Sequence, residues 1–216
     1  HRCFAVPEAW TSEGIVLDRD EAHHLAGVLR CDAGDRVCVC DGRGHSVVAT
    51  LAREGRHSVC LHPCGPVNSS PEPLPRVVLV QAPPRGKRMD ILIEKATEMG
   101  VSDLVPVVTD RSVLRPGGGA QSRRLDRWRR LAVSASCQCG RDWLPRLHPV
   151  CSLTECAALL RGADLMAYGG KKKVTAQPDG RVRGSQVITT FGPGAMLDLV
   201  TQAVLVGGLD YWGDRK

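Results

Sequence analysis

The sequence has few aromatic residues and no long apolar run. Aromatic side chains make up 4% of its 216 residues, too few to suggest the stacking platform that binds single-stranded nucleic acids. No stretch approaches the roughly 20 apolar residues that cross a bilayer, and no apolar segment follows a basic start, as it does in a secretory signal. We therefore expect a soluble, cytoplasmic protein that has no membrane partner.

Several catalytic and cofactor-binding motifs are also missing. The chain has no Gly-x-Gly-x-x-Gly fingerprint, no Walker sequence and no Gly-x-Ser-x-Gly turn, which disfavours a Rossmann dinucleotide site, a nucleoside triphosphatase and a serine hydrolase. Its 10 cysteines form no Cys-x-x-Cys pair, although Cys60, His62 and Cys64 could supply zinc ligands. We favour reduced cysteines that act as small buried hydrophobes, and we predict no metal site.

What the chain does have is an uneven charge. A composition of 43% hydrophobic and 24% charged residues is ordinary for one large or two small globular domains. Residues 1–75 carry 7 basic and 10 acidic side chains, whereas residues 76–216 carry 22 and 13. Most of the basic residues are arginines, whose planar guanidinium suits phosphate contact. The asymmetry predicts an anionic partner for the second part of the chain.

A proline-rich stretch divides the chain. Val67–Pro75 ends with three prolines in five residues, which resist both helix and central strand. We therefore predict a linker there, between domains at residues 1–70 and 76–216. Before the linker, short apolar runs separated by turn signals predict a small β-barrel with one short helix. The strands are expected at Gly14–Leu17, Arg36–Cys40, Ser46–Leu51 and Ser58–Leu61.

The expected helix of the first domain spans Asp18–Arg30. Asp18 or Asp20 stands near its start, and Leu25, Val28 and Leu29 share one face. The helix also contains His23-His24. Adjacent residues point to different sides of a helix, so these two histidines cannot hold a metal together. We expect one of them to pack inward, and nucleic-acid contact stays open as the alternative.

After the linker, apolar runs alternate with helical periods. This alternation predicts an α/β domain with a mainly parallel sheet, which binds ligands beyond the carboxyl ends of its strands. The expected strands are Arg76–Gln81, Asp103–Val108, Asp164–Tyr168 and Val187–Phe191. The expected helices are Asp90–Met99, closed by Gly100, then Arg123–Cys139, Ser152–Arg161 and Ala195–Val206.

Two segments of this domain are strongly basic. Residues 111–130 hold seven arginines against the single acid Asp126, so they gain electrostatically from an anionic partner. The segment Pro84–Arg88 follows a strand and opens a helix, where backbone N–H groups and cations can meet a phosphate. The alternative for both segments is an ordinary solvated surface. We favour phosphate contact for residues 111–130 and leave the two interpretations of Pro84–Arg88 open.

Short motifs occur in a fixed order from about residue 2 to residue 150. They are His23-His24-Leu25, Val28-Leu29-Arg30, Gly34-Asp35, Asp41-Gly42, Gln81-Ala82, Pro84, Gly86-Lys87, Met89-Asp90, Glu94-Lys95-Ala96-Thr97-Glu98, Gly100-Val101, Pro106, Arg111-Ser112-Val113, Arg127-Trp128, Ala135, Gln138, Arg141 and Pro145. Each motif is weak alone, but as an ordered set they are specific. Together they resemble the ribosomal RNA small-subunit methyltransferase E family.

The resemblance implies an α/β fold. In that family an N-terminal PUA-like β-barrel precedes a SPOUT methyltransferase domain that ends in a trefoil knot. The resemblance also implies S-adenosylmethionine as the cofactor and a homodimer as the assembly. The implied reaction methylates N3 of a uridine in 16S ribosomal RNA, in the small ribosomal subunit.

The resemblance further implies roles for individual residues. Arg141 matches a family arginine and is our catalytic candidate, because a cation can stabilise negative charge forming on the base; holding the target phosphate is its alternative role. Cofactor contacts are expected at Tyr168, Gly169, Gly192, Pro193, Gly194, Trp212 and Gly213. RNA contacts are expected at His24, Arg30, Arg85, Lys87, Arg88, Arg111, Arg123 and Arg124.

The last third of the sequence departs from the family pattern. Gly192-Pro193-Gly194 keeps the Gly-Pro of a cofactor loop but lacks the glutamate and paired glycine that follow in the family. Near the end, only Trp212-Gly213-x-Arg215 matches the start of the final motif. Three interpretations stay open: an incomplete or frameshifted copy of an active enzyme, a divergent enzyme, or an RNA-binding relative that no longer methylates. We favour a methyltransferase.

Overall fold

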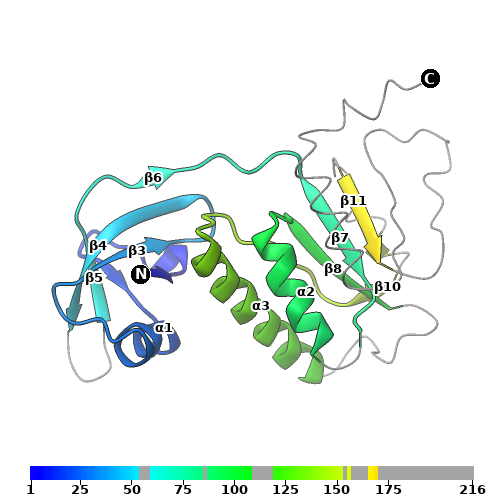
Figure 1. Ribbon diagram of the computed structural model, residues 1–216, viewed down its shortest axis with the longest axis horizontal. Helices are drawn as coiled ribbons and strands as arrows, with labels where there is room; N and C mark the ends of the chain where they lie inside the picture. The colour runs from blue at the N-terminus through cyan, green and yellow to red at the C-terminus, as the bar shows by residue number, and fades with distance from the viewer. Residues whose placement is uncertain (54–58, 85–86, 109–118, 153–154, 157–164, 170–216) are drawn as a thin grey trace. The chain divides into compact units, whose positions relative to one another are not determined.

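In the computed structural model, the described residues form two compact units (Figure 1). The described residues are 1–53, 59–84, 87–108, 119–152, 155–156 and 165–169. The first unit comprises His1–Glu72 together with Ser136–Leu144. The second unit comprises the other described residues, from Pro73 to Ala135 and from Pro145 onward. The chain therefore leaves the first unit at residue 72 and returns to it for one short segment.

The first unit is built on a curled, mainly antiparallel sheet (Figure 1). Its strands follow the order β1-β3-β4-β5-β2, and β6 pairs with β4. All neighbouring strands are antiparallel except β1 and β3, which are parallel. The strands are β1 (Arg2–Phe4), β2 (Ile15–Val16), β3 (Arg36–Cys40), β4 (His45–Arg53), β5 (Val59–Pro63) and β6 (Asn68–Ser69). A single turn of 3-10 helix, Pro7–Ala9, follows β1.

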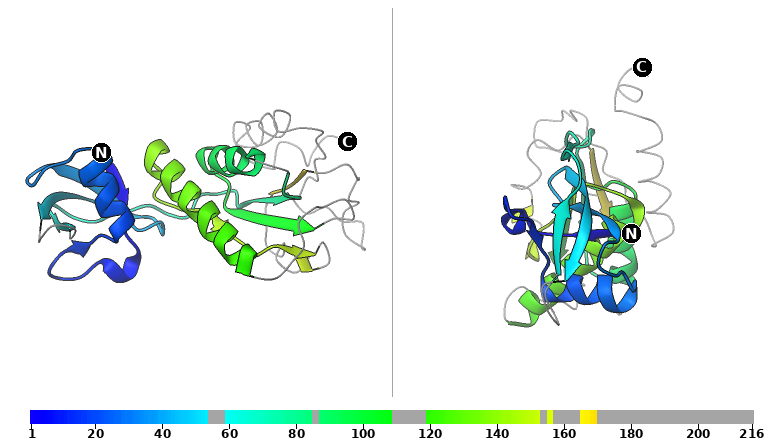
Figure 2. Two further views of the ribbon diagram at one scale, coloured as in Figure 1. Left: turned by 90° about the horizontal axis from the view of Figure 1, so that it is seen from below. Right: turned by 90° about the vertical axis from the view of Figure 1, so that its left-hand side faces the viewer.

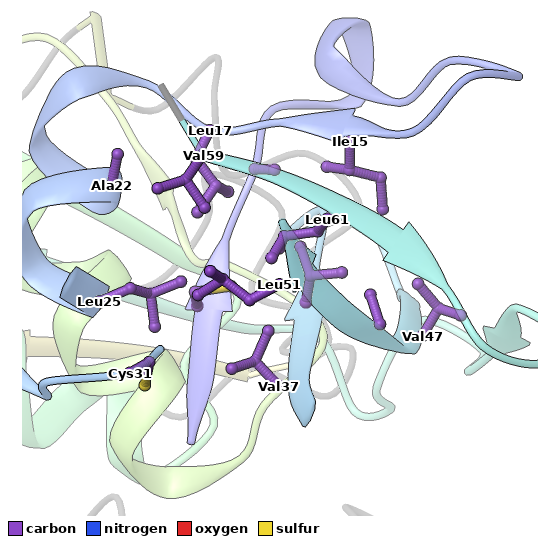
Figure 3. Close-up of a cluster of buried hydrophobic side chains, with 14 residues drawn as sticks. Ile15, Leu17, Ala22, Leu25, Cys31, Val37, Val47, Leu51, Val59 and Leu61 are labelled. Atoms are coloured by element: carbon purple, nitrogen blue, oxygen red, sulfur yellow. The ribbon is translucent and has the colours of Figure 1, made fainter. Parts of the chain in front are cut away.

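Alternating residues of this sheet form the core of the first unit. Val37 and Val39 of β3, with Val47 and Leu51 of β4, are at most 1% exposed, as the two-residue period of a strand requires. Figure 3 shows Val37, Val47 and Leu51 gathered with Leu25, which comes from the helical segment. Full burial of one such side chain contributes about 1.5–3 kcal/mol. This cluster therefore joins the sheet to the helical segment.

The helical segment begins as the sequence predicts. Helix α1 (Arg19–His23) follows Asp18, whose carboxylate accepts a hydrogen bond from the N–H of Glu21 at 2.9 Å. Such a cap satisfies one of the free N–H groups at a helix start. The chain then continues as a π-helical turn over His24–Val28, with Leu25 fully buried. The helix is therefore shorter than predicted, and its second half is wound more loosely.

The loose winding overturns two predictions about this segment. Val28 was expected on the inner face with Leu25, but it is 61% exposed, because a π turn shifts the register of the residues that follow. His23 and His24 are both exposed, so the predicted inward packing of one histidine is wrong. The ring of His23 instead lies over Gly27, where a Cβ atom would stand 3.1 Å from the His23 Cε1 atom.

The second unit contains a parallel sheet. Its strands follow the order β10-β8-β7-β11, and β9 pairs with β8. They are β7 (Val77–Gln81), β8 (Asp103–Val108), β9 (Arg146–Leu147), β10 (Cys151–Ser152) and β11 (Leu165–Gly169). Helix α2 (Arg88–Glu98) connects β7 to β8, and helix α3 (Gly119–Cys139) follows β8. The predicted parallel α/β arrangement is therefore present.

Apolar side chains cover both faces of this sheet, as expected for parallel strands. On one face Val77 and Leu79 belong to a cluster with Ile93 of α2 and Trp128 of α3. Figure 2 shows the same two helices beside β7 and β8. On the other face Val78, Val80, Val105, Val107 and Cys156 form a second cluster. The sheet is thereby a rigid base for residues at its carboxyl edge.

A buried carboxylate stands at the start of β8. Asp103 is 1% exposed, and it accepts hydrogen bonds from Arg76 Nε at 2.9 Å and His148 Nε2 at 2.8 Å. Burial opposes ionisation, but the bonds from His148 and Arg76 outweigh it and lower the pKa of Asp103 to about 2. The two hydrogen bonds therefore fix His148, which follows β9, and Arg76, which precedes β7, to the start of β8.

Other features of the fold were missed or fall outside the described residues. Strand β1 was not predicted, and β6 lies inside the predicted linker, where Asn68 and Ser69 pair with β4. Most of the predicted helix Ser152–Arg161, the strand Val187–Phe191 and the helix Ala195–Val206 lie outside the described residues. Among the helices that the structure describes, none is long and apolar enough to span a membrane.

Candidate functional site

The carboxyl edge of the parallel sheet brings together the ends of β7 and β11. Gln81, the last residue of β7, is in register with Gly169, the last residue of β11, and Val80 is in register with Tyr168. Ligands of parallel α/β sheets bind at this kind of edge. Two residues predicted to contact the cofactor, Tyr168 and Gly169, are therefore placed at the strand ends where such a ligand is expected.

This edge fits the predicted S-adenosylmethionine site as far as it is described. Gly169 carries no side chain, so a ligand can approach its backbone N–H and C=O closely. The Gln81 side chain is turned along its own strand, since its Nε2 donates to the carbonyl of Ala82 at 2.6 Å. The other predicted cofactor residues, Gly192, Pro193, Gly194, Trp212 and Gly213, lie outside the described residues.

Two of the predicted RNA-binding cations stand at the start of α2. Lys87 precedes the helix and Arg88 is its first residue, and both are exposed. A helix start carries partial positive charge, which adds to the two cations and favours an anion. In the first turn, the carboxylate of Asp90 is paired with Arg127 of α3. Arg85 lies outside the described residues.

Helix α3 presents arginines opposite its buried face. Trp128 and Ala132 are buried, whereas Arg123 is exposed and Arg124 is half-buried. Arg129 forms a loose ion pair with Asp126, with 3.4 Å between Nη1 and Oδ1. The exposure of Arg123 and the partial exposure of Arg124 are compatible with the predicted phosphate contacts. Arg111 lies outside the described residues.

The first unit places two further predicted RNA-binding residues on its surface. His24 and Arg30 are both exposed. Arg30 has a φ of 56°, in the left-handed region that costs a residue with a side chain about 1–2 kcal/mol. The fold fixes the chain on both sides of it, since the N–H of Cys31 donates to the carbonyl of Leu25 at 2.9 Å.

Arg141, the predicted catalytic residue, follows the end of α3 in the segment that belongs to the first unit. Its N–H donates to the carbonyl of Ser136 at 3.1 Å, and its own carbonyl accepts from Arg2 Nη2 at 3.2 Å. The side chain is half-buried, and this burial lowers the pKa of the Arg141 guanidinium. A half-buried cation acts on a neighbouring charge more strongly than one surrounded by water.

The contacts around Arg141 were not predicted from the sequence. Arg2 pairs with the carboxylate of Asp142, and Ser70 Oγ donates to the same carboxylate at 3.1 Å. These three residues are far apart in the chain, and single-sequence patterns carry no signal for such contacts. Only the position of Asp142, directly after a motif residue, pointed to this neighbourhood.

Metal-binding groups are not gathered among the described residues. No cluster of three or more His, Cys, Asp or Glu side chains there is arranged to hold a metal ion. In the zinc alternative, Cys60 is buried while His62 and Cys64 are exposed, and the Cys64 thiol and the Thr50 hydroxyl are 2.8 Å apart. All 10 cysteines are free thiols.

Two family descriptions match the chain. An RNA methyltransferase domain matches residues 70–194, which includes the sheet edge and continues to Gly194. An RNA methyltransferase PUA domain matches residues 17–64, which lie in the first unit. The matched ranges agree with the division of the structure into an N-terminal curled sheet and a parallel α/β unit.

Several curated relatives share the name ribosomal RNA small subunit methyltransferase E. The protein from Bacillus subtilis is 25% identical over 182 residues, which cover 81% of this chain and 71% of the relative. The protein from Synechocystis is 31% identical over 147 residues, 67% of this chain and 46% of the relative. The match to the Mycobacterium tuberculosis protein covers 54% of that relative. The chain thus matches about half the length of some relatives.

Solved structures share the fold. A methyltransferase from Legionella pneumophila, described with bound S-adenosylmethionine, superposes with a TM-score of 0.74 at 18% identity, over 96% of this chain and 97% of its own. A ribosomal RNA small subunit methyltransferase E from Neisseria gonorrhoeae, also bound to S-adenosylmethionine, gives 0.74 at 21% identity, over 97% and 98%. At 18% and 21% identity, these similarities show a shared fold only.

Proposed function

The chain belongs to the RNA methyltransferase domain family, and on this premise we propose that it methylates N3 of a uridine in 16S ribosomal RNA, with S-adenosylmethionine as the methyl donor. The observation that carries the proposal is the family match over residues 70–194. That match contains the sheet edge, where two predicted cofactor residues, Tyr168 and Gly169, lie at the end of β11 beside the parallel strand β7. The small ribosomal subunit is the proposed partner.

The chemistry of the reaction assigns a role to Arg141. S-adenosylmethionine, when bound, supplies a methyl group on a positively charged sulfur. Uracil N3 carries a proton that has to leave before or during the transfer, so negative charge develops on the base. The guanidinium of Arg141, half-buried and cationic, is suited to stabilise this charge. The rest of the rate enhancement is expected from holding the two reactants in position.

The RNA is proposed to bind mainly through its phosphates. The exposed Lys87, Arg88 and Arg123, with the half-buried Arg124, offer contacts at the start of α2 and on α3 of the second unit. His24 and Arg30 offer contacts in the first unit. With aromatic residues at 4% of the sequence, base stacking on aromatic side chains is expected to contribute little. We further propose a homodimer that acts in the cytoplasm, as the family resemblance implies.

Calorimetric titration with S-adenosylmethionine tests the proposal most directly. We expect binding, followed by methyl transfer to small ribosomal subunits, with the product identified as N3-methyluridine by mass spectrometry. Gly169→Val should weaken cofactor binding, because the added side chain stands at the strand end. Gly65→Val is the control, since a Cβ atom at Gly65 has no neighbour within 4 Å. Retained RNA binding without any heat from the cofactor would favour the RNA-binding relative that no longer methylates.

A further inference from the structure

The segment after α3 belongs to the first unit and is fixed to the rest of that unit by several hydrogen bonds. The N–H of Gly44 donates to the carbonyl of Asp142 at 3.0 Å, and the N–H of Leu144 donates to the carbonyl of Gly42 at 3.0 Å. The indole Nε1 of Trp143 donates to the carbonyl of Ser70 at 2.9 Å. These bonds hold the segment just after Arg141.

Two glycines of the β3–β4 turn leave room for this segment. Gly42 and Gly44 have φ values of 72° and 94°, which residues with side chains adopt only at a cost. A Cβ atom at Gly42 would lie 2.6 Å from Leu144 Cδ1, and one at Gly44 would lie 2.6 Å from Trp143 Nε1. The turn and the segment are therefore shaped to each other.

Arg2 holds Arg141 and Asp142 at the same time. Its Nη2 donates to the carbonyl of Arg141 at 3.2 Å and also bonds the Asp142 carboxylate. The second carboxylate oxygen of Asp142 accepts from Ser70 Oγ at 3.1 Å. The side chains of Arg2 and Asp142 are only 18% and 19% exposed, so water competes little for the pair. Arg2 thus constrains both the backbone of Arg141 and the residue that follows it.

From this arrangement we propose that Arg2 and Asp142 are positioning residues for Arg141. The proposal rests on the proposed function, in which the Arg141 guanidinium stabilises negative charge on the reacting base. A side chain can be aimed only as well as its own backbone is fixed, and small displacements of catalytic groups reduce rates strongly. The first strand of the N-terminal unit therefore takes part in catalysis through Arg141 without touching the substrate.

The same unit contains a matched arrangement that serves as a control. Arg53 Nη2 donates to the carbonyl of Cys31 at 2.9 Å and to the carboxylate of the next residue, Asp32, at 3.1 Å. This pair has the geometry of the Arg2 contacts, but its side chains are 43% and 84% exposed. It holds no residue that we assign to the reaction. Arg53→Gln therefore removes an equivalent pair without disturbing Arg141.

The test compares methyl-transfer kinetics of the intact protein and its variants on small ribosomal subunits. Arg141→Gln should lower kcat by about a hundredfold, the size typical of losing one charge-stabilising group. Arg2→Gln should lower kcat by about tenfold with little change in KM, since the guanidinium of Arg141 remains but is less well placed. Asp142→Asn is a milder change and should also lower kcat, but by less than Arg2→Gln does. Arg53→Gln should leave kcat and KM unchanged.

A double variant separates positioning from an independent role. Because Arg2 acts through Arg141, Arg2→Gln should have no further effect on kcat in a protein that already carries Arg141→Gln. A full additional tenfold loss would overturn the proposal, and so would a normal kcat for Arg2→Gln. Wild-type kcat for Arg141→Gln would instead refute the catalytic assignment of Arg141, and with it the proposal.

Hydrogen exchange gives a readout that does not depend on activity. In Arg2→Gln the backbone amides of Gly44 and Leu144, which are bonded between the turn and this segment, should exchange faster, whereas Arg53→Gln should leave them unchanged. Unchanged exchange in Arg2→Gln would overturn the proposal even in an active enzyme. If the wild type transfers no methyl group while Arg2→Gln does accelerate exchange, the proposed reaction fails although the structural restraint is real; positioning for catalysis then fails with it.

Discussion

The two compact units differ in how far apart in the sequence their packed segments lie. In the second unit α2 lies between β7 and β8 in the chain, so residues 77–104 supply most of one face of its core, to which α3 adds Trp128 and Ala132. In the first unit the strands lie within residues 1–72, but Ser136–Leu144 belongs to the unit as well. The difference shows that a unit with mostly local strand pairing can still depend on a remote segment, here the one that carries Arg141.

The largest effect is expected in the local core of the second unit. Ile93 is fully buried in α2, whereas Ile91 on the same helix is 53% exposed. Ile93→Ala should lower the free energy of unfolding by about 2–5 kcal/mol, because it leaves a cavity between helix and sheet. Ile91→Ala is the control, with an expected change within about 0.5 kcal/mol. Similar losses in urea unfolding for both variants would contradict the assigned core.

A somewhat smaller effect is expected where the remote segment meets the first unit. Gly44→Ala combines the cost of a left-handed backbone with clashes against Trp143 and the backbone carbonyl of Ser70, which itself bonds Trp143, together about 2–4 kcal/mol. Gly34→Ala is the matched control: Gly34 has a φ of 96°, but nothing lies within 4 Å of a Cβ atom there. The control should lose only about 1–2 kcal/mol. Equal losses in urea unfolding would mean that the segment contributes little to the first unit.

Acid should weaken the second unit through Asp103. Its pKa falls from an ordinary 3.8 to about 2 in the folded protein. A lowered pKa adds stability that is fully present above the unfolded value and is lost as the pH falls through the folded one. Urea unfolding should therefore lose about 2 kcal/mol between roughly pH 4 and pH 2. In Asp103→Asn this loss should be absent; an unchanged pH profile would refute the assignment.

The smallest free-energy change is expected for RNA affinity. Arg123→Ala combined with Arg124→Ala should weaken binding to ribosomal RNA by about tenfold and reduce the slope of log affinity against log salt by about 2, one for each phosphate contact. Lys95→Ala is the control in the same unit, because Lys95 has no assigned RNA contact and already pairs with Glu94 and Glu98. An unchanged salt slope in the double variant would remove α3 from the proposed RNA interface.

Much of the described part of the second unit was predictable from the sequence. The strand at Asp103–Val108 was predicted with its observed bounds, and the helix near Asp90–Met99 ends as predicted before Gly100, which has a φ of 90°. The family and the α/β class are confirmed by the domain matches and the shared fold. Apolar periodicity and turn residues are local signals, so they survive in a single sequence.

The first unit shows where local signals fail. The apolar pattern placed Val28 beside Leu25, but the π turn exposes it, because the winding of a short helix is decided by what it packs against. Asn68 and Ser69 lie in a proline-rich stretch and still form a strand, since β4 supplies the partner. The exposure of Val28 and the pairing of Asn68 and Ser69 with β4 depend on distant parts of the chain, so the neighbouring residues in the sequence do not indicate them.

The sequence by itself determined the charge asymmetry, the parallel α/β unit, the family and the candidate residues. Only the tertiary structure joined Arg2 to Asp142 and assigned the Arg141 segment to the first unit. The physical reason is the range of the interactions. Helix periods, caps and turns depend on residues close together in the sequence. The ion pair between Arg2 of the first strand and Asp142, which follows α3, forms only after the chain has folded.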